Sequence, residues 1–120
     1  MTSPVEAHVA VKNDHLREVV LDARAWLRDR LATRQWRAAK VLWDNESHWN
    51  PLSGTPTTCF GIPQACPGRK MRSAIRPKRG ARWDSIYDPF VQISWGRVYV
   101  RERYGGFVPA LRFQKRHGWY

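Results

Sequence analysis

The sequence predicts a small, mainly α-helical domain with one long irregular segment in its middle. Two stretches in the N-terminal half carry apolar residues at spacings of three and four, the period of an amphipathic helix. A third stretch opens with Asp88-Pro89 and closes at Gly105-Gly106, which is typical of helix starts and ends. With 120 residues, the chain has the length of one domain.

The first predicted helix begins at Asp14 and follows residues 1–13, which we interpret as a flexible lead. Residues 14–120 then form the domain. An apolar stripe runs along this helix, with charged residues such as Arg24 off the stripe. The stripe consists of Leu16, Val20, Ala23, Leu27 and Leu31.

A second helix is expected after Thr33, which can cap it. Its apolar face carries Trp36, Ala39, Trp43 and, near its end, Glu46. The helix should stop at Asn50-Pro51, because the residue before a proline avoids the helical conformation. Trp26, Trp36 and Trp43 lie on helical stripes and are predicted to be core residues.

Residues 51–82 have no sustained period and are rich in Pro, Gly, Ser and Thr, then in Lys and Arg. We interpret them as a long loop with short strands or turns near residues 57–62. The third helix follows, with Asp88 as its N-cap and Pro89 as its first residue. A last short helix is predicted from Pro109 to about His117.

The two cysteines, Cys59 and Cys66, stand seven positions apart. They form either one disulfide or two free thiols. Zinc sites normally need four ligands, and only His48 and His117 could complete a set. We therefore expect no metal site.

The chain is strongly basic, with 21 Lys and Arg against 10 Asp and Glu, a net charge of +11. Seven of these cations occur without an intervening acid, at Arg69, Lys70, Arg72, Arg76, Lys78, Arg79 and Arg82. Such a run suits a polyanion, whether nucleic acid, an acidic wall polymer or an anionic membrane surface; alternatively it is a solvated loop.

No run of ~18 apolar residues occurs, so we expect no membrane span. The first dozen residues contain Glu6, His8 and Lys12 and no apolar segment, so a secretory signal peptide is not expected either.

Glu46 is the candidate for acid–base chemistry. A carboxylate on the apolar face of a helix is desolvated, and near the C-terminus it also faces the negative end of the helix dipole. Both effects raise its pKa, which is what a general acid requires near neutral pH. The alternative is a solvated glutamate or one paired with a nearby arginine.

Several segments together resemble the lysozyme-like lytic transglycosylase domains of actinobacteria and their phages. The resemblance covers about residues 15–120. It is carried by Glu46-Ser47-His48-Trp49-Asn50-Pro51, Cys59-Phe60-Gly61-Ile62-Pro63-Gln64, Pro67-Gly68-Arg69-Lys70-Met71, Asp88-Pro89-Phe90-Val91-Gln92-Ile93-Ser94-Trp95-Gly96, Tyr104-Gly105 and Gly118-Trp119-Tyr120.

The resemblance implies an α+β lysozyme-like fold in which the irregular loop forms one side of a glycan cleft. It implies cleavage of the β-1,4 bond between N-acetylmuramic acid and N-acetylglucosamine in peptidoglycan, without a cofactor. Glu46 matches the catalytic glutamate, which protonates the bridging oxygen and then deprotonates the C6 hydroxyl to close a 1,6-anhydro ring. Without a signal peptide, delivery to the cell wall would use a virion, holin-type release or specialised secretion.

The same resemblance implies substrate contacts for residues around the glutamate. Ser47 matches a serine that steadies the acid or binds the sugar; the alternative is a helix-end cap. Gly61 and Gln64 match a Gly-x-x-Gln turn in which the glycine admits the sugar and the amide binds its acetamido group; the alternative for Gln64 is a turn-stabilising amide. Phe60 stands where the family usually has tyrosine, so its ring could pack under Glu46.

Aromatic residues supply the remaining candidates. Tyr99 falls near the position of a family tyrosine that contacts the catalytic carboxyl, although core packing is the favoured interpretation. Trp49, Trp83 and Trp95 could stack on sugar rings, because a broad ring face suits the apolar face of a pyranose. The Arg69–Arg82 loop departs from the family and could dock to stem-peptide carboxylates or to phosphate-bearing wall polymers.

Two rival functions stay open at this point. A hydrolytic muramidase would need a second carboxylate, for which Asp84 or Asp88 is available, whereas Asp44 should point off the Glu46 face. A lysozyme-like module without turnover would instead bind wall glycan or nucleic acid through its basic and aromatic residues.

Overall fold

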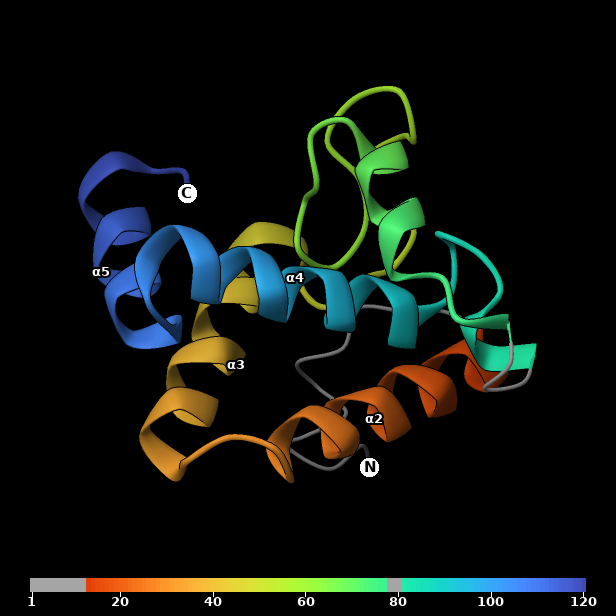
Figure 1. Cartoon of the computed structure of the whole chain (residues 1–120), viewed down its shortest axis with the longest axis horizontal. Helices are drawn as coiled ribbons and strands as arrows, with labels where there is room; N and C mark the ends of the chain where they lie inside the picture. The colour runs from red at the N-terminus through yellow and green to blue at the C-terminus, as the bar shows by residue number, and fades with distance from the viewer. Residues whose placement is uncertain (1–12, 78–80) are drawn as a thin grey trace.

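The computed structural model describes residues 13–77 and 81–120 and confirms a mainly helical architecture (Figure 1). Its elements are α2 (Asp14–Arg28), α3 (Thr33–Ser47), η1 (Gly68–Ala74), η3 (Ala81–Trp83), α4 (Pro89–Tyr104) and α5 (Phe107–His117), where η denotes a 3-10 helix. α4 crosses the centre of the molecule and packs against α2, α5, η1 and η3, while α3 packs against α5. No helix within the described ranges is long and apolar enough to cross a membrane.

The first helix begins as predicted. Asn13, which we had placed in the lead, caps α2 by accepting a hydrogen bond from the backbone N–H of Leu16 at 2.9 Å. The remainder of the predicted lead, residues 1–12, lies outside the described residues. The predicted stripe is buried at Val20, Ala23 and Leu27, and Leu31 packs on the core just beyond the helix end.

Arg24 is buried, so the prediction that it lies off the buried face is wrong. Its guanidinium lies 4.5 Å from the ring centroid of Trp49 and 5.6 Å from that of Trp36. A guanidinium over aromatic rings recovers part of the cost of its burial. The contacts with these two rings make the burial of Arg24 tolerable. Both rings lie outside α2, so no residue pattern within α2 predicts this burial.

α3 differs slightly from its prediction at both ends. Thr33 is its first residue, and Ala32 takes the cap position in an extended conformation. The helix ends at Ser47, because His48 and Trp49 both adopt left-handed backbone conformations with φ of 53° and 57°. The helix thus stops before Asn50-Pro51 is reached.

The predicted long loop contains more structure than expected. η1 and η3 lie within it, and instead of short strands there are isolated antiparallel bridges from Phe60 to Gly54 and to Ala65. Cys59 and Cys66 form a disulfide, which selects one of the two open alternatives. The described residues therefore show a disulfide-closed turn and 3-10 helices where an α+β fold would place strands.

α4 begins and ends at the residues that the sequence predicts, whereas α5 begins earlier than predicted. Asp88 accepts a hydrogen bond from the Phe90 N–H at 2.7 Å, Pro89 opens α4, and Gly105 closes it at φ 85°. α5 begins at Phe107, two residues before the predicted start. The Gln35 side chain accepts from the Phe107 N–H at 2.6 Å and so supplies the cap from α3.

Asp88 gives a testable pH dependence. Burial raises its pKa from 3.8 to about 6, against the hydrogen bonds from Phe90 and Val91, which favour the carboxylate. Between those two values the folded protein holds a proton that the unfolded chain has lost, so this group's contribution to stability falls as pH rises through the interval. Asp88→Asn keeps the cap and removes this titration.

We therefore expect Asp88→Asn to be more stabilising, relative to wild type, at pH 7 than at pH 4. The difference should be about 1 kcal/mol, because the half-exposed position screens part of the effect. Asp88→Ala should lose roughly 1 kcal/mol through loss of the cap. Urea unfolding at both pH values tests this, with Asp14→Asn as control. An equal effect of Asp88→Asn at the two pH values would contradict it.

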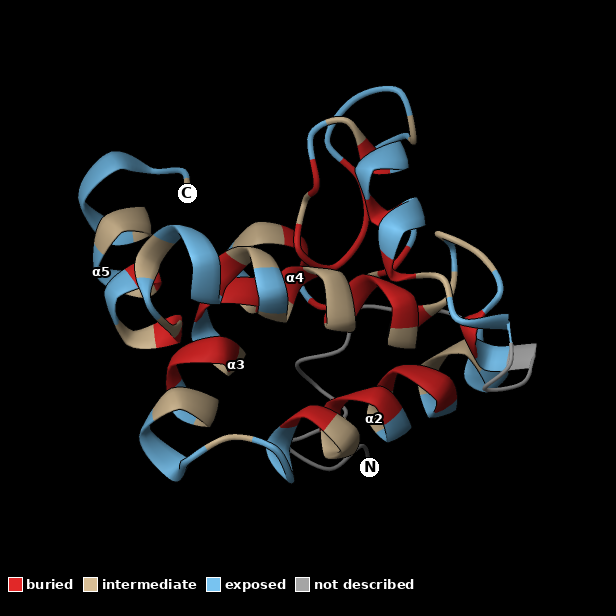
Figure 2. Cartoon of the chain, viewed as in Figure 1, coloured by how far each residue is buried: buried red, intermediate tan, exposed pale blue. Residues whose placement is uncertain are grey.

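The buried residues form two clusters, and Trp26 and Phe90 pack against both. Figure 2 shows where the buried residues lie along the chain. The larger cluster lies between α2, α3, α4 and α5 around the fully buried Trp43, and the facing sides of α2 and α4 are buried. The smaller cluster lies beneath η1 and against α4, and consists of Phe60, Ala65, Met71, Ala74, Trp83 and Val91. The predicted core positions of Trp26, Trp36 and Trp43 are confirmed.

Candidate active site

Glu46 is the second-last residue of α3 and is half-buried. Burial raises its pKa above the usual 4.5, as the sequence predicted. No Lys, Arg or His in the described part of the chain forms an ion pair with it. Among the described residues, Glu46 therefore does not form the ion pair with an arginine that was the alternative interpretation. An uncompensated, desolvated carboxyl is suited to hold and release a proton.

Two tyrosines lie within electrostatic range of this carboxyl. Burial chiefly raises the pKa of Tyr99 and of Tyr120, and the charge of Glu46 raises both further. The rings of Tyr99 and Tyr120 meet edge to face, with centroids 5.7 Å apart. The Tyr120 hydroxyl accepts from Trp43 Nε1 at 2.8 Å and donates to the Pro63 carbonyl at 2.6 Å. Tyr120 thus ties α3 to the 61–64 turn beside Glu46.

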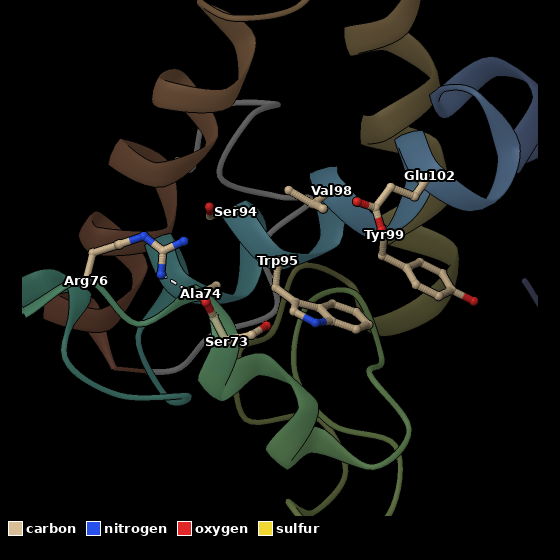
Figure 3. A pocket seen from close by; sticks show the side chains of 8 residues that line it. All are labelled: Ser73, Ala74, Arg76, Ser94, Trp95, Val98, Tyr99 and Glu102. Atoms are coloured by element: carbon tan, nitrogen blue, oxygen red, sulfur yellow. Dashed lines mark hydrogen bonds between the residues drawn. The ribbon is translucent and has the colours of Figure 1, made fainter.

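An aromatic pocket opens next to Tyr99 (Figure 3). The rings of Trp95 and Tyr99 are stacked, 5.1 Å apart and 12° from parallel, and both are partly exposed. They line a pocket of about 280 Å³ together with Ser73, Ala74, Arg76, Ser94, Val98 and Glu102. Tyr99 therefore belongs to this partly exposed surface as well as packing against the core, and Trp95 offers a ring on the same surface.

The turn from Gly61 to Gln64 is anchored on both sides by buried side chains. Ser47 Oγ donates to the Ile62 carbonyl at 2.7 Å and to that of Trp43 at 3.1 Å. Gln92 Oε1 accepts from the Ile62 N–H at 2.8 Å. α3 and α4 thereby hold this turn between them, with the acid at the end of α3.

The space beside Gly61 is filled by the side chain of Gln92. The φ of Gly61 is 79°, and a Cβ there would lie 2.6 Å from the Gln92 amide. Gln64 Nε2 donates to the carbonyls of Ser53 and Gly61 at 3.1 and 2.9 Å, which is the turn-stabilising alternative. Direct sugar contacts were predicted for Gly61 and Gln64; the structure places both in the framework of the turn.

Four further residues that were predicted to contact substrate are buried. Ser47 is 5% exposed and its hydroxyl is occupied by two carbonyls, so it positions the turn. Trp49 is 1% exposed, with Nε1 bonded to the Lys40 carbonyl, and cannot present a ring face to a sugar. Phe60 is 2% exposed and packs in the smaller cluster against Tyr87, not under Glu46. Trp83, likewise a predicted sugar platform, is buried against Trp26 and Phe90.

Glu102 lines the Trp95–Tyr99 pocket, whereas the three aspartates considered as a second carboxylate lie elsewhere. Asp44 lies on the opposite side of α3, 3.4 Å from His48 and lining a different pocket with Arg24. Asp84 lines a third pocket, and Asp88 caps α4. Within residues 13–77 and 81–120, no three His, Cys, Asp or Glu side chains gather as metal ligands.

Two important residues were missed by sequence reasoning. Gln92 is fully buried and also donates to the Pro51 and Ile86 carbonyls at 2.9 and 2.8 Å. Its signal was available, since a lone amide between Val91 and Ile93 is a buried polar group in need of partners. Tyr120 entered the sequence analysis only as the last residue of the Gly118-Trp119-Tyr120 segment. No feature of the neighbouring sequence predicts its hydrogen bond with Trp43.

Comparison with known proteins adds no relative: no family model, no curated protein and no solved structure matches the chain. The chemistry is therefore argued from the site itself. It comprises one half-buried carboxyl whose pKa is raised, two phenols within its electrostatic range, and an aromatic pocket lined by one of them, Tyr99. A carboxyl with a raised pKa can give a proton to a ligand and take one back.

Proposed function

We propose that this chain is a peptidoglycan lytic transglycosylase that acts at the bacterial cell wall. It breaks the N-acetylmuramic acid–β-1,4–N-acetylglucosamine bond and leaves a 1,6-anhydro end, with Glu46 as acid and base. The observation that carries the proposal is the half-buried Glu46 carboxyl, which forms no ion pair with any described residue and lies within electrostatic range of Tyr99. The resemblance noted in the sequence supplies the substrate.

The reaction needs a single carboxyl group. Protonated Glu46 gives its proton to the bridging oxygen as the bond to the muramic C1 breaks, which leaves an oxocarbenium-like centre. The Glu46 carboxylate then removes the proton from the C6 hydroxyl while O6 bonds to C1. The proton is returned to Glu46, no water is consumed, and no cofactor takes part. The absence of Asp44 from the Glu46 side of α3 is in keeping with this route.

Trp95 and Tyr99 would bind the glycan. Their stacked rings present an apolar surface for a pyranose, and Ser73, Ser94 and Glu102 line the same pocket with polar groups suited to sugar hydroxyls. The Tyr99 hydroxyl would stabilise the Glu46 carboxylate once its proton has left. Ser47, Gly61, Gln64 and Gln92 support the site by holding the turn.

The pH profile follows from the direction of the Glu46 pKa shift. The first step uses the protonated acid, so turnover should fall as pH rises through the Glu46 pKa, and burial places that fall above the usual 4.5. Initial rates of sacculus solubilisation from pH 4 to 9, at constant ionic strength, measure it. A rate that keeps rising with pH across this range would contradict the acid role.

A second candidate is a module that binds wall glycan or nucleic acid without turnover. It is favoured by the net charge of +11 and by the internal engagement of Ser47, Phe60 and Gln64. Binding that depends on neutralised phosphates weakens steeply with salt, whereas binding in a glycan cleft should respond less. A muramidase is the enzymatic alternative.

Mass spectrometry of muropeptides released from purified sacculi separates these functions. Ends in 1,6-anhydro-muramic acid, absent with Glu46→Gln, are the expected result. Reducing ends would mean that water is the acceptor and would overturn the anhydro mechanism in favour of a muramidase. Folded protein that sediments with sacculi and releases nothing would establish the binding module instead. Delivery by a virion, holin-type release or specialised secretion belongs to the same proposal.

A further inference from the structure

A second pocket lies apart from the Trp95–Tyr99 surface. Its volume is about 410 Å³, and it is formed between η1 and the segment that leads into α4; these two segments are neighbours at the right of Figure 1. It is lined by Pro56, Thr57, Arg69, Arg72, Ile75, Asp84, Ser85, Ile86 and Tyr87. None of these residues lines the pocket formed by Trp95 and Tyr99.

The pocket is lined by side chains of both charge signs that form no ion pairs among the described residues. Arg69 and Arg72 stand three residues apart on η1, and side chains at that spacing share one face of a 3-10 helix. Asp84 lines the pocket from the other wall. Within the described residues, none of the three takes part in an ion pair. The pocket thus offers two cations and one anion to a ligand.

The walls that hold these charges are fixed by the core. Met71 and Ala74, on the inner face of η1, are buried in the smaller cluster, and the Gly68 N–H donates to the Thr58 carbonyl at 3.0 Å. On the other wall, the Tyr87 ring meets Phe60 edge to face at 5.4 Å and is still 51% exposed. A pre-formed pocket with an exposed aromatic ring loses little entropy when a ligand binds.

We propose that this pocket binds the stem peptide of peptidoglycan, a peptide that in its diaminopimelate tripeptide form carries three free carboxylates and one ammonium group. Arg69 and Arg72 receive two of the carboxylates, Asp84 receives the ammonium, and Ile75, Ile86 and Tyr87 contact the aliphatic chain between them. The inference rests on the proposed function for its choice of peptide. It adds a peptide subsite to a glycan-cleaving enzyme.

The mixed charge favours a peptide over a polyphosphate chain. A carboxylate in the pocket would repel the uniformly negative backbone of nucleic acid or of a phosphate-bearing wall polymer. The ammonium of a zwitterionic peptide instead gains a partner. The run of basic residues predicts a general docking surface for anions. Because Asp84 also lines this pocket, the ligand expected here carries both negative and positive charges.

Calorimetric titration with a sugar-free peptide tests the assignment. The probe is N-acetyl-L-alanyl-γ-D-glutamyl-meso-diaminopimelate, in which the diaminopimelate side-chain amine is the single ammonium group, as in the glycan-linked peptide. It is used with the full chain carrying Glu46→Gln and with wild type. The double substitution Arg69→Gln/Arg72→Gln should weaken binding about tenfold or more, and so should amidation of the peptide carboxylates. Asp84→Asn should weaken binding of the free peptide but not of the peptide acetylated on its diaminopimelate side-chain amine.

The matched control is Arg112→Gln/Arg116→Gln, which removes the same charge from exposed positions on α5. It should leave peptide affinity within about twofold, with all variants showing the wild-type circular dichroism spectrum. Equal losses in both double variants would overturn the proposal, because they would show a nonspecific effect of net charge. Loss of oligonucleotide binding in the η1 variant with unchanged peptide affinity would assign the pocket to nucleic acid.

The peptide subsite and the catalytic proposal fail separately. Peptide binding by Glu46→Gln, together with no release of muropeptides by wild type, would retain the subsite and reject the enzyme. Cleavage of sacculi by a protein that does not bind the peptide would retain the enzyme and reject the subsite.

Discussion

Replacing Glu46 by glutamine should lower the initial rate of muropeptide release at least about 100-fold, the usual scale of general acid–base catalysis. Glutamine keeps the shape of the side chain but carries no proton that titrates near neutral pH. The same group serves both proposed steps, so the substitution removes the proton donor for the bridging oxygen and the acceptor for the C6 hydroxyl. Stability should not fall, because burial already disfavours the Glu46 carboxylate.

Glu18→Gln is the matched control, since Glu18 is exposed on α2 and the same charge is removed. It should retain wild-type rates. Rates are compared by solubilisation of purified sacculi at pH 5 to 6, and folding by circular dichroism and thermal melting. A Glu46→Gln variant that keeps more than roughly a tenth of the activity would remove Glu46 from the acid–base role.

Replacing Gln92 by methionine should destabilise the fold by about 3 kcal/mol or more. Methionine matches glutamine in length, so the change removes the amide without leaving a large cavity. Two buried backbone groups, the N–H of Ile62 and the carbonyl of Pro51, lose their partner, and so does the partly buried carbonyl of Ile86. Each such group costs about 1–3 kcal/mol when it is left unsatisfied.

Urea unfolding measures this loss, and Gln114→Met is its control. Gln114 is on α5 and accepts one bond, at 3.2 Å, from the exposed Asn45 side chain, so the change should cost less than about 0.5 kcal/mol. Glycan cleavage by Gln92→Met should fall as well, because Ile62 carries the carbonyl that Ser47 bonds beside Glu46. A Gln92→Met variant within about 1 kcal/mol of wild type would show that the amide network is dispensable.

Much of the helical framework could be predicted from the sequence, because its signals are local. The apolar stripe defines α2, and Asp88-Pro89 with Gly105 defines both ends of α4. Hydrogen bonds between near neighbours produce these features, so the residues that decide them stand side by side in the chain. The start of α5 departs from its prediction for the opposite reason, since its cap is Gln35, 72 residues earlier.

The candidate site was predictable at its acid and at the two aromatic residues of the pocket, Trp95 and Tyr99, but not around the 61–64 turn. Glu46 was identified from its position on the apolar face near a helix end, and burial raises its pKa in the predicted direction. Ser47, Gly61 and Gln64 were expected to contact substrate. In the structure the Ser47 hydroxyl bonds to the carbonyls of Trp43 and Ile62, and the Gln64 amide bonds to that of Ser53. The space beside Gly61 is filled by Gln92. Those partners come from other segments, which periodicity does not place.

The sequence by itself determined the helices, their caps and one desolvated carboxylate, because 3.6-residue periodicity and capping chemistry act within a few residues. Only the tertiary structure decided which aromatic rings are exposed: it buried Trp49 beneath Arg24 and left Trp95 and Tyr99 stacked at a pocket. It also placed Asp84 opposite Arg69 and Arg72. Burial and charge pairing are properties of segments brought together by packing, so they become defined only when α3, α4 and the 51–83 segment are assembled.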